Sequence, residues 1–202
     1  MSWDFLDPSE DGEENLGLAA SFRRVPGGAA AYFEEAQAGV IRSLVSQIAE
    51  LVSADSTAAE VAETGEEDAV EAELGLSSHD EPPEDPVLAR LLPDGYRDDP
   101  RASAEFRRYT EEGLRSAKVA SAQSVLASLP ATGGEVLLSE PECQQWLRAL
   151  NDVRLALSVR LGISDENEDL SEHLTADDPR SAYVWVYQWL AYLQDSLIDA
   201  LT

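Results

Sequence analysis

The spacing of apolar residues divides the chain into a short alternating region near the N-terminus and several longer segments with a helical period. Apolar positions alternate with other residues over 16–22 and again over 29–33, and Pro26-Gly27-Gly28 stands between the two runs. Alternation on both sides of a proline and glycine turn predicts a β-hairpin. From residue 34 to residue 53, apolar side chains recur every three or four positions, which predicts an amphipathic helix with one buried face.

Four further helices are predicted after residue 85, and capping residues and prolines mark where three of them begin. Asp85-Pro86 opens a short helix, Ser139-Glu140-Pro141-Glu142 has the pattern of a capping box, and Asp178-Pro179 opens the last helix. Between the second and third of these helices, the apolar segment Val136-Leu137-Leu138 fits either a third strand or a plain connection. The expected helix ranges are 86–92, 103–129, 139–161 and 178–201.

Two of these helices have apolar or small-residue faces that are expected to pack against another helix or a second subunit. On the helix at 103–129, one stripe joins two aromatic residues to small residues that would let another helix approach closely: Phe106, Tyr109, Gly113, Ala117, Ala120 and Ser124. The last helix is apolar around most of its circumference, and Trp185, Trp189 and Tyr192 form one of its two apolar faces. Such a helix is either central in a bundle or covered by a second subunit, so a homodimer through this helix is an open alternative.

The charge of the chain is concentrated in three stretches. The chain has 40 acidic and 14 basic residues and a formal net charge of −26, and residues 1–14, 55–85 and 164–178 hold 25 of the acids without a Lys or Arg. Residues 55–85 also contain no aromatic residue, which is typical of a segment that cannot bury enough apolar surface to offset its ordering entropy. We expect a disordered acidic linker there, which either acts as a spacer or binds a partner.

Together these patterns predict a mainly α fold, a single helical-bundle domain with a small N-terminal β-hairpin and a long acidic disordered insertion. Residues 1–14 are expected to form an acidic disordered tail, and residues 15–54 the hairpin and the first helix of the bundle. After the linker at 55–85, residues 86–202 supply the remaining helices of the same domain.

Composition narrows the function. A protein that neutralises nucleic-acid phosphates needs clustered Lys and Arg, so direct binding of DNA or RNA is not expected. The sequence lacks a run of about 18 apolar residues, which argues against a membrane span. Its N-terminus carries acids where a secretory signal needs basic and apolar residues, so we expect a cytoplasmic protein.

The residues that carry most enzyme chemistry are scarce or scattered. The two histidines, His79 and His173, have no second His or Cys at the spacing of metal ligands. The sequence has no GxSxG and no glycine-rich phosphate loop, and in so acidic a chain carboxylate pairs are expected by chance. We therefore expect no enzyme activity, no metal and no cofactor; a hydrolase that uses carboxylates would need a deep cleft lined by acids.

Cys143 and Arg154 fall on the apolar stripe of the helix at 139–161. The thiol is either a small core residue or a redox centre, since the first turn of a helix favours thiolate while Glu140 and Glu142 oppose it. With a single cysteine, no internal disulfide can form. The guanidinium of Arg154 is expected to be a buried structural charge and to have a carboxylate partner.

Basic residues cluster in the segment 90–118, which holds seven of the 14. On the helix at 103–129, four of them lie among glutamates at spacings of three and four: Arg107, Arg108, Arg115 and Lys118. This spacing predicts a solvated ladder of ion pairs, with an anion-binding patch as the alternative.

Five blocks of the sequence together resemble the AosR-type proteins of actinobacteria, a family of oxidative-stress transcriptional regulators. They are FRRV near the N-terminus, DPVLARLLPDGY, EFRRYTEEGLRSAK, WLRALNDVRLALSVRLGI and the Trp- and Leu-rich C-terminal helix. The resemblance covers most of the chain apart from the first dozen residues and the acidic linker. It implies a regulator that binds an extracytoplasmic-function-type sigma factor in the RNA polymerase holoenzyme and promotes genes of thiol and cysteine metabolism under oxidation.

The resemblance also implies an internal disulfide as the switch, which a chain with Cys143 alone cannot form. Either oxidation acts through a mixed disulfide or an intersubunit bridge at Cys143, or this chain keeps only the partner-binding role. The expected contact surfaces are the face with Arg107, Arg108 and Arg115 and the stripe with Trp185, Trp189 and Tyr192. The alternative function is an acidic, non-catalytic adaptor or a self-associating scaffold without redox sensing.

Overall fold

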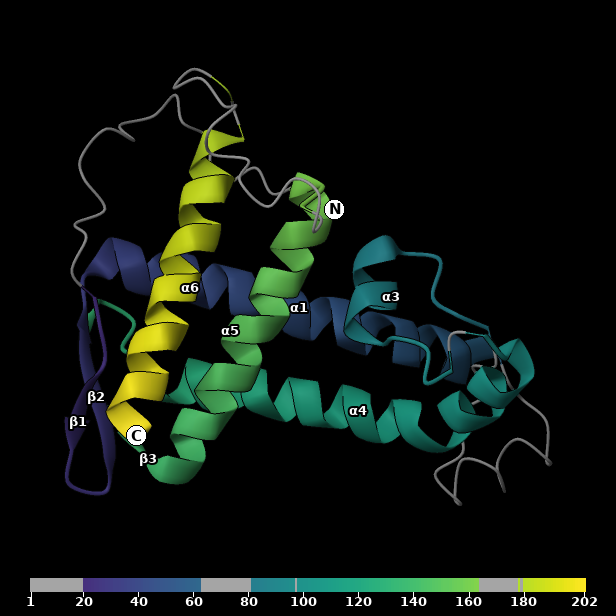
Figure 1. Ribbon diagram of the computed structural model, residues 1–202, viewed down its shortest axis with the longest axis horizontal. Helices are drawn as coiled ribbons and strands as arrows, with labels where there is room; N and C mark the ends of the chain where they lie inside the picture. The colour runs from purple at the N-terminus through teal and green to yellow at the C-terminus, as the bar shows by residue number, and fades with distance from the viewer. Residues whose placement is uncertain (1–19, 63–80, 97, 164–177, 179) are drawn as a thin grey trace.

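The computed structural model describes residues 20–62, 81–96, 98–163, 178 and 180–202, drawn in colour in Figure 1. The predictions for the acidic tail at 1–14 and for residues 63–80 of the linker lie outside the described residues. The acidic residues at 164–177 also lie outside the described residues. The two histidines, His79 and His173, fall in these two undescribed ranges, 63–80 and 164–177.

A three-stranded antiparallel sheet forms at the N-terminal end of the domain. Strands β1 (Arg23–Val25) and β2 (Gly28–Phe33) form the predicted hairpin, in the register that pairs Arg23 with Ala30. Strand β1, however, lies after the alternating run at 16–22 that predicts the first strand. Strand β3 (Gly134–Ser139) pairs antiparallel with β2, so the strand order is β1-β2-β3. The apolar segment that fitted either a strand or a connection is therefore a strand. A Cβ atom at Gly28 would lie 1.8 Å from the Leu138 carbonyl oxygen, so this close approach of β2 to β3 requires glycine.

The helices are α1 (Glu35–Ala62), α3 (Pro86–Leu91), α4 (Pro100–Ser128), α5 (Glu140–Leu161) and α6 (Ser181–Leu201). Predicted caps hold three of their ends. The Asp85 carboxylate accepts hydrogen bonds from the first turn of α3, Ser139 donates to the Glu142 carboxylate at the start of α5, and Gly162 ends α5 with a φ of 67°.

Three helix boundaries differ from the prediction. Helix α1 continues to Ala62, into the range expected as linker. Helix α4 begins at Pro100 because the Asp99 carboxylate accepts a hydrogen bond from the backbone N–H of Ala102. Helix α6 begins at Ser181, after a turn in which Asp178 accepts from the backbone N–H of Arg180.

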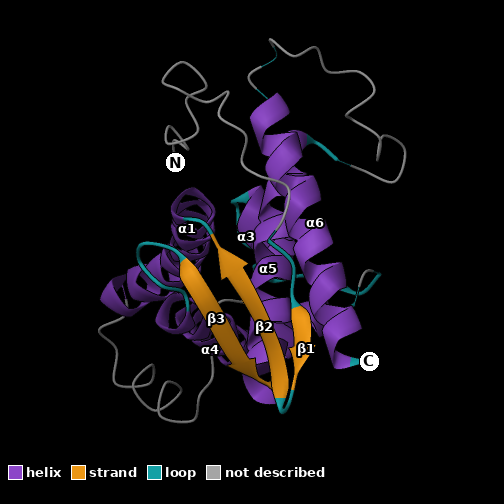
Figure 2. Ribbon diagram, turned by 90° about the vertical axis from the view of Figure 1, so that its left-hand side faces the viewer, coloured by secondary structure: helices purple, strands orange, loops and turns teal. Residues whose placement is uncertain are grey.

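The helices form two layers that cross, with the sheet at one end (Figure 1). Helices α1 and α4 lie side by side and antiparallel, and α5 and α6 run across them. Figure 2 shows that the helices lie behind one face of the sheet and leave its other face open. The predicted mainly α fold with a small N-terminal sheet is thus confirmed. None of the described helices combines the length and the apolar character needed to cross a bilayer.

An aromatic cluster joins the sheet to the helices. The ring of Trp146 on α5 is fully buried, stacks on Phe33 at a centroid distance of 5.8 Å and meets Phe22 edge-on at 5.5 Å. Its Nε1 donates a 2.8 Å hydrogen bond to Ser128 Oγ at the end of α4. One side chain therefore contacts β2, α4 and the segment before β1.

Helix α6 lies within the core of the same chain. It packs against α5 and the sheet, and it buries one face of apolar residues: Val186, Leu190, Leu193 and Leu197. The intrachain alternative for this helix is thus confirmed for that face.

Replacing Trp146 by alanine is expected to lower the free energy of unfolding by about 3–5 kcal/mol, because it removes the apolar contacts and leaves a cavity. Urea unfolding monitored by circular dichroism measures the change. Tyr32→Ala, which truncates an exposed aromatic residue of β2, is the control and should change stability by less than about 0.5 kcal/mol. A similar small change for both variants would show that the cluster does not hold the domain together.

Candidate functional site

Helix α4 buries charged residues and exposes aromatic ones. Arg107, Glu111 and Arg115 are 5%, 3% and 3% exposed, whereas Phe106 and Tyr109 are 45% and 65% exposed. The ion pairs have the predicted spacing of four residues, but they face the interior. The prediction of a solvated ladder is therefore wrong for Arg107, Glu111 and Arg115, and Arg107 and Arg115 do not form the expected contact face with Arg108.

The three buried residues form one network, here called the Arg107–Glu111–Arg115 triad. Oε2 of Glu111 accepts from Arg107 Nη1 at 2.8 Å, and Oε1 accepts from Arg115 Nη2 at 2.7 Å and Nε at 2.9 Å. The second nitrogen of Arg107 is 2.6 Å from Asp94 Oδ1. Each buried charge therefore has an opposite charge within hydrogen-bond distance, which burial of an ion requires.

The remaining donors of the triad reach backbone carbonyls of two other helices. Arg115 Nη1 donates to the Val52 carbonyl oxygen in α1 at 2.8 Å, and Arg107 Nη1 donates to the Leu92 carbonyl oxygen at the C-terminal end of α3 at 3.3 Å. Leu92 lies at the C-terminal end of α3, where carbonyl groups lack partners within the helix and carry partial negative charge. The triad thus ties α4 to α1 and to the end of α3.

The side chain of Arg107 stays protonated although it is buried. Burial opposes the charged guanidinium, but the hydrogen bonds and the attraction of Glu111 and Asp94 outweigh it and raise the pKa of Arg107 above its ordinary value. The guanidinium therefore keeps its charge throughout the physiological pH range.

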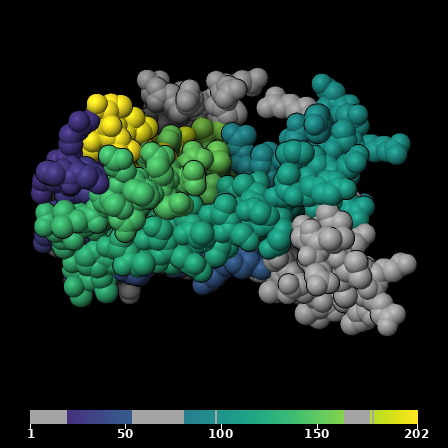
Figure 3. Space-filling view, turned by 90° about the horizontal axis from the view of Figure 1, so that it is seen from below, coloured from purple at the N-terminus to yellow at the C-terminus, as the bar shows by residue number. Residues whose placement is uncertain are grey.

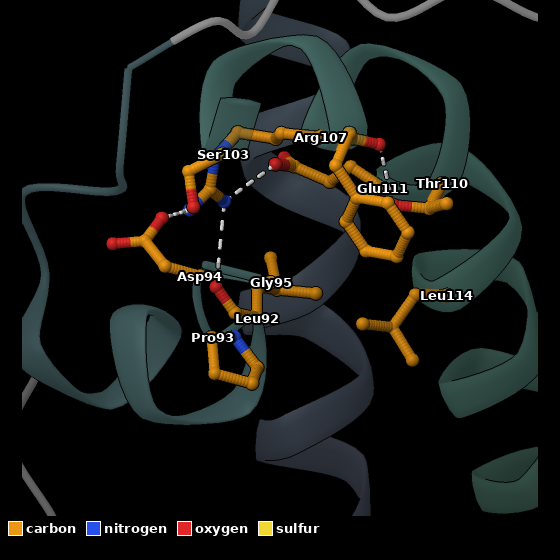
Figure 4. Close-up of a pocket in the computed structure, with 10 residues that line it drawn as sticks. Leu92, Pro93, Asp94, Gly95, Ser103, Arg107, Thr110, Glu111 and Leu114 are labelled. Carbon is orange, nitrogen blue, oxygen red and sulfur yellow. Dashed lines mark hydrogen bonds and ion pairs between the residues drawn. The ribbon is translucent and has the colours of Figure 1, made fainter. Parts of the chain in front are cut away.

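A small pocket of about 40 Å³ lies beside the triad, between the first half of α4 and the loop after α3 (Figure 4). Leu92, Pro93 and Leu114 contribute apolar walls. The loop is held close to α4, because Ser103 Oγ bonds both the N–H and the carbonyl of Tyr96, at 3.1 and 3.0 Å. Pockets for small-molecule ligands measure about 300–1,000 Å³, so this one suits the end of a single side chain rather than a metabolite.

Outside the pocket, α4 presents a continuous stripe to solvent, here called the α4 outer face. Its members are exposed and either aromatic, aliphatic or small: Phe106, Tyr109, Gly113, Leu114, Ala117 and Ala120. Helix α4 lies along the side of the molecule that faces the viewer in Figure 3. The stripe that the sequence offered for close approach of another helix is thus present, but within the described residues no helix packs on it.

The other predicted contact residues are divided between interior and surface. Trp189 is buried and stacks on the half-buried Trp185 at 5.8 Å, while Tyr192 is exposed and Arg108 is half-buried. The expected aromatic contact stripe on α6 is therefore reduced to Tyr192 and part of Trp185.

Arg154 is half-buried, as expected for a structural charge, but its partners differ from the prediction. It donates to Gln194 Oε1 at 2.7 Å, and its guanidinium lies 5.0 Å from the centre of the Tyr187 ring. In the described part of the chain, an amide and an aromatic ring thus replace the expected carboxylate. These groups partner the guanidinium through a hydrogen bond and a cation–π contact.

Cys143 is fully buried, which favours the core alternative over the redox one. Burial raises the pKa of the thiol above its ordinary value, and the charges of Glu142 and Glu140 raise it further, against backbone hydrogen bonds that lower it. A buried thiol with a raised pKa has little thiolate at neutral pH and reacts slowly with oxidants.

Sequence reasoning missed two features. Asp152 is buried on α5 and pairs with Lys118 at 2.6 Å, and burial raises its pKa although Lys118 opposes that rise. Gly95 lies under the Phe106 ring, where a Cβ atom would approach to 2.7 Å. The dipeptide Asp94-Gly95 indicated a turn, but nothing local indicated the ring above it. In the described ranges, no group of three His, Cys, Asp or Glu side chains could hold a metal ion.

Replacing Glu111 by glutamine is expected to destabilise the fold by about 3–5 kcal/mol, because two buried guanidinium groups lose their shared counter-charge. Glu112→Gln, at the adjacent exposed position, is the matched control and should cost less than about 0.5 kcal/mol. Urea unfolding of both variants measures the difference. Equal stability of the two variants would contradict a buried triad.

In the native protein, Cys143 is expected to resist a thiol reagent such as dithionitrobenzoate at neutral pH, because the thiol is inaccessible and its raised pKa lowers the thiolate fraction. Absorbance at the wavelength of the released thiolate follows the reaction. The same chain in guanidinium chloride is the control and should react completely. Rapid labelling of the folded protein would restore the redox alternative.

Known relatives of the chain carry names that concern oxidative stress. It is 38% identical over 138 residues to the oxidative stress regulator AosR of Mycobacterium tuberculosis and of Mycobacterium bovis, a match that covers 62% of this chain and 62% of each relative. The putative oxidative stress regulator AosR of Mycobacterium leprae is 38% identical over 132 residues, or 59% of each chain. The aligned part thus spans less than two thirds of these relatives, and no solved structure matches.

The resemblance noted in the sequence blocks is therefore confirmed. The model of one protein family, described as a domain of unknown function (DUF2017), matches residues 19–201, which is nearly the whole of the described structure. This chain belongs to the DUF2017 family.

Proposed function

We propose that this protein is a cytoplasmic regulator of the response to oxidative stress, and that it acts by contact with a sigma factor of RNA polymerase to promote genes of thiol and cysteine metabolism. The names of the relatives support the regulatory role, since three of them are oxidative stress regulators by name. The proposal of a protein partner, rather than DNA, follows from the net charge of −26.

The observation that carries the proposal is the concentration of exposed apolar residues on and beside α4. Of the eight large apolar side chains exposed in the described residues, four lie there: Tyr96, Phe106, Tyr109 and Leu114. Aromatic residues that stand on a rigid element are typical of the centres of protein interfaces. The triad behind this surface holds α4 in place, so the surface is organised before a partner binds.

The burial of Cys143 favours the alternative in which this chain only binds the partner, over a mixed disulfide or an intersubunit bridge at Cys143. A mixed disulfide and an intersubunit bridge both need an accessible thiol, and this one is fully buried. In our proposal, the chain keeps the partner-binding role, and the signal of oxidation comes from outside this chain.

The proposal is tested with the purified full chain, RNA polymerase core enzyme and individual sigma factors of the source organism, in a binding assay on immobilised protein. Phe106→Ser with Tyr109→Ser is expected to weaken binding of a sigma factor or holoenzyme at least about tenfold, because two interface anchors of more than about 1 kcal/mol are lost. Tyr32→Ser, at an exposed aromatic residue on the sheet, is the control and should bind like the wild type.

Cys143→Ser should bind like the wild type with and without peroxide, provided that its urea unfolding shows an intact fold. If neither polymerase nor any sigma factor binds the wild type, the proposed function is wrong. If binding requires Cys143 and oxidant, the partner-binding role stands but the assignment of redox sensing to another molecule is wrong.

A further inference from the structure

We propose that the α4 outer face binds an amphipathic α-helix of the partner, which places one apolar side chain in the pocket beside Phe106 and carries Lys or Arg along its flanks. This inference rests on the proposed function, because it names the kind of partner segment that the same surface would take. It is carried by the shape of the face, the chemistry of the pocket and the charge of the chain.

The shape of the face suits a helix. From Phe106 to Ala120 the face extends about 21 Å along a straight helix, at 1.5 Å per residue. Apart from Leu114, its far half consists of small residues, and a Cβ atom at Gly113 would meet nothing within 4 Å. Small side chains let two helix axes come within about 8 Å, so an amphipathic helix can bury one apolar stripe against this face.

The chemistry of the pocket selects an apolar anchor. Its polar wall groups already have partners within the chain: Arg107 with Glu111 and Asp94, Ser103 with Tyr96, and the Thr110 hydroxyl with the Phe106 carbonyl at 2.8 Å. A polar group that entered the pocket would lose its water and find these partners occupied, which costs free energy. An aliphatic side chain loses nothing and gains contacts with Leu114 and Pro93.

The charge of the chain selects the flanks of the partner helix. Glu105 and Glu112 are both exposed and lie on the side of α4 next to Tyr109, each about one turn from Tyr109 along the helix. The whole chain carries a net charge of −26, and a second copy with the same net charge would be repelled at long range. Basic flanks of a partner helix would lie next to these two carboxylates and are attracted toward the acidic chain at long range.

The probe is a fluorescein-labelled model peptide of about 18 leucine and lysine residues, or five helical turns, with the leucines on one face. Fluorescence anisotropy measures its binding to the full chain in about 150 mM salt, which screens weak contacts with exposed acids. Gly113→Gln places a bulky neutral side chain in the middle of the face. Gly39→Gln, at an exposed glycine of α1 whose Cβ would also meet nothing within 4 Å, is the matched control.

We expect Gly113→Gln to raise the dissociation constant of the peptide at least about tenfold and Gly39→Gln to change it less than about twofold. Both variants should unfold at the wild-type temperature or above, because glutamine is a better helix former than glycine. A peptide with glutamate in place of lysine should not bind. The proposal is overturned if the lysine peptide fails to bind, if it binds Gly113→Gln like the control, or if the wild type dimerises and Gly113→Gln abolishes the dimer.

The polymerase assay separates this inference from the proposed function. If a sigma factor binds wild type and Gly113→Gln equally well, the proposed function stands and the helix-docking inference is wrong. If no polymerase component binds but the lysine peptide discriminates between the two glycine variants, the inference stands and the proposed function is wrong.

Discussion

The carboxylate of Glu111 lies between the guanidinium groups of Arg107 and Arg115 inside the protein, and this arrangement fixes the rotation of α4 about its axis. A buried charge without a partner costs several kcal/mol, roughly as much as the net stability of many domains. Rotating α4 by half a turn would return the charges of the triad to water. The same rotation would break the hydrogen bonds of Arg115 and Arg107 to the carbonyls of Val52 and Leu92. The network therefore specifies one orientation of α4 against α1 and α3.

This orientation has a direct consequence for the surface. With charges on the inner face, the aromatic residues and the small residues that follow them on α4 face solvent. In a helix that buried its apolar stripe, Phe106 and Tyr109 would be core residues with no role in binding. Here they stand on a helix that two neighbours hold rigid, next to a pocket the size of one side chain. In the proposed function, such a surface would recognise another protein by shape and apolar contact, and the negative charge of the chain would speed its encounter with a basic partner.

Elements with local signals could be predicted from the sequence. The turn of the hairpin and β2 followed from Pro26-Gly27-Gly28 and the alternation after it, and α3 and α5 followed from the caps at Asp85 and Ser139, because these interactions involve residues within a few positions of each other. The apolar period of α5 also indicated which of its faces is buried, and Cys143, which the sequence left open between core residue and redox centre, lies on that face.

The face of α4 could not be predicted in this way. Its sequence contains two stripes at helical spacing, one aromatic and one charged, and the general rule that charged residues face water selects the wrong one. The charged stripe can be buried only because Leu92, 15 residues from Arg107, and Val52, 63 residues from Arg115, supply acceptors. The partner of Arg154 was missed for the same reason, since Gln194 is 40 residues away. No local pattern reports such contacts.

The rotation of α4 can be measured directly by chemical footprinting of the full chain, with peptide mass spectrometry as the readout. Hydroxyl radicals report the exposure of aromatic residues, and phenylglyoxal reports the exposure of arginines. The account predicts that Phe106 and Tyr109 are oxidised readily, and that phenylglyoxal modifies the exposed Arg23 and Arg101 but neither Arg107 nor Arg115. Modification of Arg107 and Arg115 together with protection of Phe106 and Tyr109 would contradict it, because α4 would then bury the opposite face.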